Sequence, residues 1–219
     1  KPVIFQSKRV PIDSYALGLL LGNGSITNQT MAFTTMDAEL CSVISEKGRC
    51  HVKPKLQRYQ YNINRSSHLK SVLLKLGLLG RKSHTKHVPD IYKFNDVSVR
   101  LGLLQGLMDT DGTAGKKGDC EFKTASMALA SDVKFLIQSL GGLCTVRPVR
   151  YEYSGKMLRI YRCAIRMPDA SLLFRLRRKK MRCQNRSSRI LRRRIVAVEY
   201  VRDEQCVCIK VDNLDGLYL

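Results

Sequence analysis

An aspartate beside a glycine, at the end of an apolar run, is the first feature of this sequence that could do chemistry. The stretch is GLMDTDG, Gly106 to Gly112. Small residues recur in it every four positions, which predicts a helix that a second helix can approach closely. Asp111 would then lie at the helix C-terminus, where the helix dipole opposes a carboxylate. Because a bound cation would remove that conflict, the stretch predicts a metal site.

A second stretch repeats this pattern 88 residues earlier in the chain. GLLLGNG, Gly18 to Gly24, has small residues at the same spacing, Gly18 and Gly22, and ends in a glycine as the other copy does. It has Asn23 at the position that Asp111 holds in the other copy. We expect Gly24 and Gly112 to end their helices as left-handed caps. The two helices would pack against each other along their glycine faces.

Asp109 leaves two interpretations open, a helix-end or turn residue and a catalytic carboxylate. The letters DTDG also occur in calcium loops, but the EF-hand has glycine sixth and glutamate twelfth. Gly112 is fourth when counted from Asp109, so an EF-hand is excluded.

The cysteines and histidines do not indicate a zinc site. None of the eight cysteines forms a CxxC pair, and the four histidines lack zinc-finger spacing. Scattered cysteines in apolar contexts favour reduced core residues over disulfides. We therefore expect a reducing, intracellular location, cytoplasmic or nucleoid-associated.

The charge of the chain favours nucleic acid over an acidic membrane or an acidic protein as its partner. Lys and Arg number 39 against 18 Asp and Glu, a net charge of +21, and such an excess opposes compaction. Eleven of the twenty residues in 175–194 are basic, which indicates phosphate contact more than a solvated helix face. No apolar run reaches the roughly 18 residues of a membrane span. No signal peptide is visible, and the chain starts without Met, as an excised fragment would.

Several segments have the patterns of regular elements that would position the two motifs. Asp13 and Ser14 are both suitable N-caps for a helix that reaches about Asn23. Asp37 opens a second helix, and Ser98 begins the helix that ends in the second motif. The remaining patterns predict strands within 25–35, 50–64, 119–125 and 143–166, an amphipathic helix over 67–79 and a loop over 84–95.

The order of these elements occurs twice, and so do some of the letters. AFTTMDAEL at 32–40 matches EFKTASMAL at 121–129, and CHVKP at 50–54 matches CTVRP at 144–148. SHLKSVLLKLG at 67–77 has a counterpart in DASLLFRLRRK at 169–179. The repeat is too long for a solenoid. It predicts an α+β fold of two pseudo-symmetric αββαββα lobes with antiparallel sheets and a central two-helix interface. The predicted domains are 1–97, which includes a basic lead-in, 98–190, and a strand-like tail over 191–219.

The paired motifs resemble those of LAGLIDADG homing endonucleases, of the dodecapeptide type carried inside inteins. KSHTKHVP at 82–89, FTTMDAEL at 33–40 and LRRKK at 176–180 support the resemblance, which covers about residues 12–190. The tail over 199–219 is similar to strands near the end of intein splicing domains. It lacks the terminal His-Asn and the chain lacks an opening Cys or Ser, so we do not expect this chain to splice.

The resemblance implies a site-specific double-strand DNA endonuclease that hydrolyses phosphodiesters with Mg²⁺. Mn²⁺ would substitute, whereas Ca²⁺ would bind without supporting cleavage. It implies metal ligands at Asp111 and Asn23, with Gly22 and Thr110 beside them. Asn has the shape of Asp without its charge, so we expect DNA binding with impaired or absent cleavage.

The resemblance also places one lysine of each lobe near a scissile phosphate. Lys86 in KHVP matches the pattern for the first lobe. Lys179 is the choice for the second lobe, with Lys180 next to it as the runner-up. Each could instead be an ordinary phosphate-binding lysine.

In this family the two sheets form a saddle on the major grooves of a long, specific DNA duplex, bound by a pseudo-symmetric monomer. Arg and Gln read base edges, and Lys contacts phosphates. Strand alternation points only half of the candidates toward DNA. These candidates are Gln29, Lys53, Lys55, Gln57, Arg58, Gln60, Asn62, Lys123, Arg147, Arg150, Arg159, Arg162 and Arg166.

Two alternatives remain open. Asn23 favours a LAGLIDADG-derived protein that binds without cutting, such as a transcription regulator or an RNA maturase. The intein-like tail argues against that alternative. A basic structural protein that binds RNA or a membrane would explain the charge, but not the duplicated glycine motifs.

Overall fold

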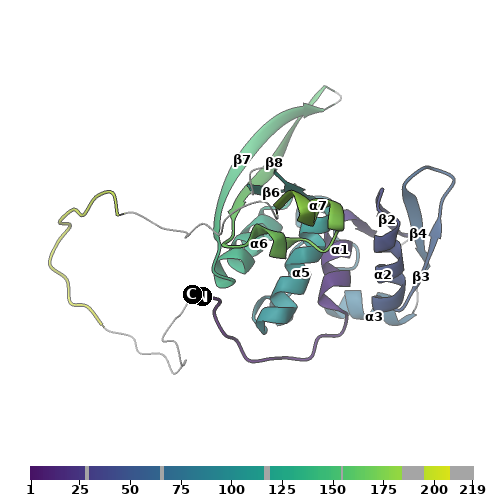
Figure 1. The fold of residues 1–219 in the computed structure, drawn as a ribbon, viewed down its shortest axis with the longest axis horizontal. Helices are drawn as coiled ribbons and strands as arrows, with labels where there is room; N and C mark the ends of the chain where they lie inside the picture. Colours follow the sequence, from purple (N-terminus) through teal and green to yellow (C-terminus); the bar gives the residue numbers. More distant parts are fainter. Residues whose placement is uncertain (28–29, 65–66, 116–118, 154, 184–194, 208–219) are drawn as a thin grey trace.

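The computed structural model describes residues 1–27, 30–64, 67–115, 119–153, 155–183 and 195–207 (Figure 1). They form two four-stranded antiparallel sheets of equivalent topology, in the orders β1-β2-β4-β3 and β5-β6-β8-β7. The first lobe contains α1 (Ser14–Asn23), β1 (Gly24–Ile26), β2 (Met31–Thr34), α2 (Glu39–Lys47), β3 (His51–Pro54), β4 (Gln60–Asn64) and α3 (Ser67–Lys75).

The second lobe repeats this order. It contains α5 (Val97–Thr110), β5 (Gly112–Ala114), β6 (Cys120–Thr124), α6 (Met127–Ser139), β7 (Leu143–Tyr153), β8 (Lys156–Arg166) and α7 (Arg177–Cys183). The predicted α+β class and the αββαββα order of each lobe are therefore confirmed. The β7–β8 hairpin is much longer than the β3–β4 hairpin and curves away from the helices (Figure 1).

Helices α1 and α5 lie side by side in the centre of the molecule, as the glycine spacing predicts (Figure 1). A Cβ on Gly18 would overlap the Leu103 carbonyl oxygen, and one on Gly106 would overlap the Tyr15 carbonyl oxygen. At the far end of the contact, Gly22 lies against the Thr110 side chain. Glycine is required here because the two backbones touch.

Aspartate caps both central helices. The carboxylate of Asp13 accepts from Ala16 N at 3.0 Å, and that of Asp96 accepts from Val99 N at 2.9 Å. Because Asp96 is the N-cap, α5 begins at Val97, one residue before the predicted Ser98.

The prediction of left-handed caps at the two motif glycines is wrong. Gly24 has φ −78° and ψ 133°, so it is extended and already starts strand β1. Gly112 likewise opens β5 and is not among the glycines with positive φ. Neither position has space for a side chain. A Cβ on Gly24 would overlap the Leu20 carbonyl oxygen, and one on Gly112 would overlap the Met108 carbonyl oxygen.

Two other segments differ from the sequence prediction. The expected loop over 84–95 includes part of a 3₁₀ turn, η1 (Ser83–Thr85), and a short helix, α4 (Asp90–Lys93). A second 3₁₀ turn, η2 (Ala170–Leu173), precedes α7. Residues 195–207 form no strand and are exposed, so the strand prediction for this part of the tail is wrong, and residues 208–219 lie outside the described structure. No helix in the described ranges is long and apolar enough to cross a membrane.

The N-terminal lead-in packs on the second lobe although it precedes the first. Val3 N donates to Ser139 O at 2.8 Å, and the buried Arg100 guanidinium contacts the Val3 carbonyl oxygen. Phe5 stacks against Phe135 with ring centroids 6.4 Å apart. The lead-in therefore runs from α6 back to the start of α1 and links the two lobes.

The prediction of reduced cysteines is confirmed for the described residues. The seven described cysteines form no disulfide, and all of them except Cys206 are buried. Cys208 lies outside the described residues.

We expect Gly106→Ala to lower the free energy of unfolding by about 2 kcal/mol, because the added Cβ meets the backbone of α1. Gly77→Ala is the control: a Cβ there meets nothing within 4 Å, and only its φ of +68° opposes alanine. Urea denaturation would measure both, and an equal loss in the two variants would contradict the close helix contact.

Candidate active site and nucleic-acid interface

The C-terminal ends of α1 and α5 meet at a pocket of about 300 Å³. Asp111, the C-cap of α5, lines it and is the only acidic residue among its lining residues. Asn23, the last residue of α1, is half-buried and is not one of them. The lining residues are Leu21, Gly22, Ser83, Lys86, Asp111, Lys123, Thr124, Ala125 and Ile160.

Lys86 is buried at the end of α1, where its ammonium binds backbone carbonyls. Its Nζ donates to the carbonyl oxygens of Leu21 at 2.8 Å, Gly22 at 3.0 Å and Gly24 at 2.7 Å. A helix leaves its last carbonyls without partners, and the positive charge also suits the negative end of the dipole. Lys86 therefore acts as a cap of α1.

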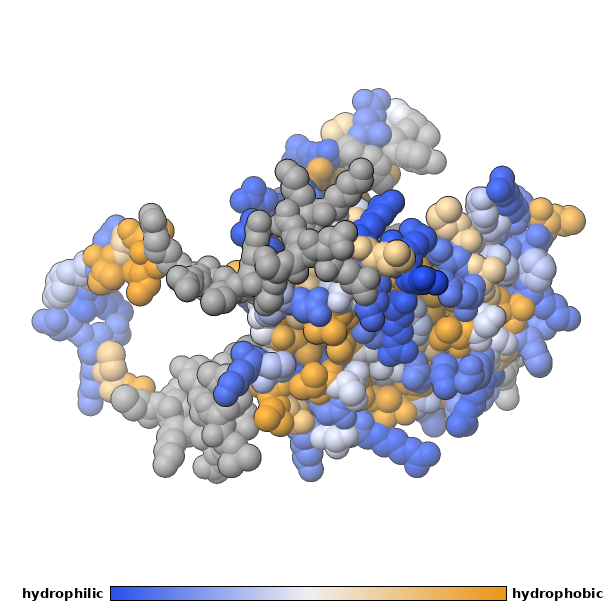
Figure 2. All heavy atoms as spheres, viewed as in Figure 1, coloured by the Kyte–Doolittle hydropathy of each residue, from blue (hydrophilic) through white to orange (hydrophobic). Residues whose placement is uncertain are grey.

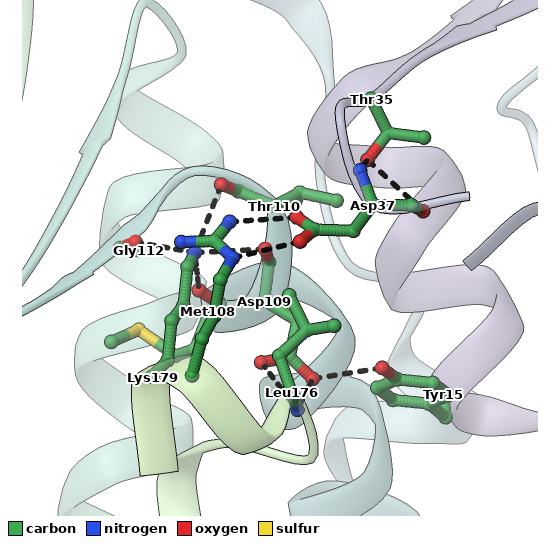
Figure 3. A network of polar contacts seen from close by, with 10 residues as sticks. Tyr15, Thr35, Asp37, Met108, Asp109, Thr110, Gly112, Leu176 and Lys179 are labelled. Carbon is green, nitrogen blue, oxygen red and sulfur yellow. Dashed lines mark hydrogen bonds and ion pairs between the residues drawn. The ribbon is translucent and has the colours of Figure 1, made fainter. Parts of the chain in front are cut away.

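Lys179 does the same for α5 (Figure 3). Its Nζ donates to the carbonyl oxygens of Met108 at 2.9 Å, Asp109 at 2.8 Å and Gly112 at 2.7 Å. Lys180, the runner-up from the sequence, is exposed, so Lys179 is the structural equivalent of Lys86.

Burial lowers the pKa of each of these two lysines to about 8. Carboxylate charge raises the pKa in part: that of Asp111 for Lys86, and that of Asp109, with a smaller effect of Asp111, for Lys179. Conversely, burial raises the pKa of the Asp111 carboxyl, and the charges of Lys86 and Lys179 lower it. The three groups thus form one electrostatic unit at the junction of the helix ends.

The oxygen atoms at this junction are ligands of the kind that a hard divalent cation prefers, but only one group among them carries a negative charge. Asp111 supplies the carboxylate, and the amide oxygen of Asn23 is neutral. The carbonyl oxygens of Gly22 and Thr110 already accept from Lys86 at 3.0 Å and Lys179 at 3.3 Å. No group of three or more His, Cys, Asp or Glu side chains that could hold a metal lies within the described ranges.

Asp109 is buried and holds elements together, which supports its structural interpretation. Its carboxylate accepts from the Tyr15 hydroxyl at 2.8 Å and from Arg175 N at 2.9 Å (Figure 3). Leu176 N donates to the same carboxylate at 3.2 Å. Asp109 therefore links α1 to the segment that leads into α7 and Lys179. The sequence analysis missed Tyr15, whose only signal is a polar hydroxyl in an apolar helix.

Side chains of the opposite lobe hold the segments that carry the two lysines. Ser126 Oγ, at the start of α6, donates to Lys86 O at 2.5 Å. Asp37, just before α2, accepts from Arg178 Nε at 2.7 Å and Nη2 at 2.6 Å. Asp37 and Ser126 occupy equivalent places in the duplicated stretches 32–40 and 121–129. This equivalence could have indicated their shared role, which the sequence analysis missed.

The strand register separates the DNA-binding candidates into two faces. In the first sheet, Met31, Phe33 and Ile63 are buried on the core face. In the second, Phe122, Cys163 and Ile165 are buried on the core face, over α6. The opposite, solvent-exposed faces are called the outer faces below.

Seven candidates lie on the outer faces. They are Lys53, Gln60, Asn62, Lys123, Arg147, Arg162 and Arg166. Arg150 and Arg159 pair with each other on the core-face side, beyond the end of the core. Lys55, Gln57 and Arg58 lie in the loop between β3 and β4, and Gln29 lies outside the described residues. Sequence analysis missed His51, Asn64 and Glu121 on the outer faces, because a polar residue type does not indicate which face of the sheet its side chain is on.

Comparisons with known proteins agree with this architecture. Residues 98–202 match the family model of a LAGLIDADG-like domain. A replicative DNA helicase DnaB of Mycobacterium intracellulare is 30% identical over 212 residues, which is 95% of this chain. The chain spans only 33% of the length of that curated relative.

Solved structures of the homing endonuclease I-DmoI match the fold. A structure of its mesophilic variants has a TM-score of 0.51 at 14% identity, over 74% of this chain and 92% of that chain. A substituted form in complex with its target DNA in the presence of Mg matches equally well, with a TM-score of 0.51 and 14% identity over the same shares. At this identity the likeness concerns the fold alone. The chain therefore contains a LAGLIDADG-like domain and has the two-lobed fold of a LAGLIDADG homing endonuclease.

We expect Lys179→Met to lower the free energy of unfolding by about 2 kcal/mol, because it leaves the last carbonyls of α5 without a buried donor. Lys180→Met is the matched control, since that lysine is exposed next to it. Thermal or urea unfolding of both variants measures the difference, and equal stability would contradict the capping role of Lys179.

A double-mutant cycle on Asp37 and Arg178 should give a coupling energy of about 1 kcal/mol, because the pair is bidentate but partly exposed. The hydrogen bond from Arg178 lowers the pKa of Asp37 below its usual 3.8. The contribution should therefore be full above that value and disappear as the pH falls through the lowered pKa. Asp90→Ala, which removes an exposed carboxylate, is the control, and a coupling that does not weaken as the pH is lowered from 3.8 would contradict this account.

Proposed function

We propose that this chain is a site-specific DNA-binding protein of the homing-endonuclease type, with a divalent-metal hydrolytic site that is impaired by Asn23. The observation that carries the proposal is the arrangement of cations on the outer face of the second sheet. It lies beside the pocket that holds Asp111 and Lys86.

Basic residues stand directly opposite each other on the β7–β8 hairpin. Arg147 pairs with Arg162, and Arg150 pairs with Arg159. Like charges in such cross-strand positions are destabilising, and Glu121 contacts only Arg162 among them. A polyanion laid along the outer face would relieve the repulsion between Arg147 and Arg162, and the phosphates of a DNA duplex have the required charge density. Hydrophilic residues, with apolar ones among them, occupy the visible surface over this hairpin and α7 (Figure 2).

The metal of this proposal is Mg²⁺, with Mn²⁺ as a substitute and Ca²⁺ as a non-supporting ion. Asp111 would hold it together with the oxygens of Asn23, Gly22 and Thr110. The bound cation would polarise the phosphodiester and its attacking water. Lys86 and Lys179 keep the helix ends, and therefore these oxygens, in place. With one carboxylate in place of two, we expect cleavage to be slow.

Asn23 also favours a second candidate, a LAGLIDADG protein that binds DNA without cutting, or an RNA maturase. Both would use the same outer faces. Comparing the affinity for duplex DNA with that for structured RNA of equal charge distinguishes the maturase from the endonuclease and from the DNA-binding protein that does not cut.

We further propose that the chain acts as a monomer, inside a reducing compartment, with the division 1–97, 98–190 and 191–219. The DnaB relative, which is three times as long, is consistent with an intein as the source of this chain. In residues 195–207 several apolar side chains are more than 80% exposed, including Val196 and Val198.

DNA binding should weaken steeply with salt, and a duplex selected from a randomised pool by binding to this chain is the probe. Arg147→Ala with Arg162→Ala should reduce the slope of log affinity against log salt by about 2. Arg150→Ala with Arg159→Ala, on the other side of the same hairpin, is the matched control and should change it less. Fluorescence anisotropy from 50 to 300 mM salt measures both, and a flat response would refute duplex binding by this face.

A further inference from the structure

The two halves of the junction differ in more than Asn23 and Asp111. The register pairs Gly24 with Phe33 and Gly112 with Phe122. The next residue along each strand is Thr34 in β2 and Lys123 in β6. Both point to the outer face of their sheet. Thr34 is therefore the positional equivalent of Lys123.

One half combines three charged groups in a single pocket. Asp111, Lys86 and Lys123 all line the cavity of about 300 Å³, and the Ser83 hydroxyl joins them. They come from α5, from the segment after α3, and from β6, so both lobes contribute. Lys123 also lies opposite Arg162 on the DNA-facing side of the sheet, which makes the pocket continuous with the basic outer face.

The equivalent positions of the other half are Asn23, Lys179 and Thr34. They contain neither the carboxylate nor the second lysine. Each lysine donates to four carbonyl oxygens at the end of its motif helix, so the capping lysines are alike. The acceptors are Met108, Asp109, Thr110 and Gly112 for Lys179, and Leu20, Leu21, Gly22 and Gly24 for Lys86. The difference between the halves is thus one carboxylate and one ammonium.

We propose that this chain is a strand-selective nicking enzyme, which cuts only the DNA strand whose phosphate occupies the pocket of Asp111, Lys86 and Lys123. The proposal rests on the proposed function above, and it adds which strand is cut. The ligand of the pocket is a single backbone phosphodiester.

The cleavage step would need two charged groups of this pocket, the Asp111 carboxylate and the Lys123 ammonium. A water oxygen bonds to phosphorus while the bond from phosphorus to the 3′ oxygen breaks. One water hydrogen ends on the 3′ hydroxyl, and the other leaves the new 5′ phosphate as a proton to solvent. Negative charge grows on the phosphoryl oxygens, where fixed cationic donors are most effective. Lys123 has no bond to a helix end in the described structure, so its ammonium is free to meet this charge, whereas Lys86 is occupied by α1.

The experiment uses this chain and the selected duplex, labelled differently on its two strands, with Mg²⁺. We expect one strand to be cut at least ~100-fold faster than the other, the usual effect of losing such a charged group. Asp111→Asn should abolish the cut and keep binding. Lys123→Ala should slow the cut by about tenfold or more, while Lys134→Ala, an exposed lysine on α6, should not change it.

A gain-of-function variant tests the missing groups directly. Asn23→Asp with Thr34→Lys should raise the cutting of the silent strand at least tenfold relative to the cutting of the first strand. Equal cutting of both strands by the unaltered chain, or no cutting of either, would overturn the proposal.

A readout without metal separates this inference from the proposed function. In EDTA, bound duplex should protect Lys123 from acylation, and Lys134 should stay reactive. Loss of duplex binding would refute the proposed function. Binding without protection of Lys123 would refute the phosphate pocket alone.

Discussion

The close contact between the glycine faces of α1 and α5 is the constraint on which the rest of the structure depends. Gly18 and Gly106 bring the two backbones together, so the helices end side by side. Their last carbonyl groups and the negative ends of both dipoles then converge at one place. Such a junction is unfavourable unless positive charge is brought to it. The fold supplies that charge within each lobe. Lys86 follows α3 in the first lobe, and Lys179 lies in α7 in the second.

The positions of the two lysines depend on contacts between the lobes. Each one caps the motif helix of its own lobe, but the segment that carries it is bonded to the opposite lobe. Ser126 holds the Lys86 backbone, and Asp37 holds the neighbour of Lys179. The lead-in adds a third link, because it reaches the second lobe before the chain enters the first. The glycine contact is thus reinforced on both sides by bonds that cross the pseudo-two-fold axis.

Sequence reasoning was strongest where one physical rule decides the outcome. Glycine spacing predicted the helix pair, and the duplicated order of elements predicted the two lobes. The choice of Lys86 and Lys179 as corresponding lysines came from the family resemblance. It failed where the outcome depends on neighbours that are distant in the sequence. The sequence pattern predicts positive φ at Gly24 and Gly112. Instead, both positions must be glycine because a Cβ would overlap a carbonyl oxygen of the preceding helix. The faces of Arg147 and Arg150 could not be told apart, since a strand's register is set by its partner. Exposed residues 195–207 have the composition of a strand but no pairing partner in the described structure.

The same geometry explains how the halves can share an architecture and differ in charge. Gly22 against the Thr110 side chain is the last packed position of the helix contact. Asn23 and Asp111 come one residue later, where the chain turns into β1 and β5. An amide and a carboxylate of equal shape fit that position equally well, so packing does not select between them. Thr34 and Lys123 lie on outer faces, where packing imposes no choice either. The backbone contact therefore keeps the two lobes symmetric, while the groups that would act on a phosphate are free to diverge.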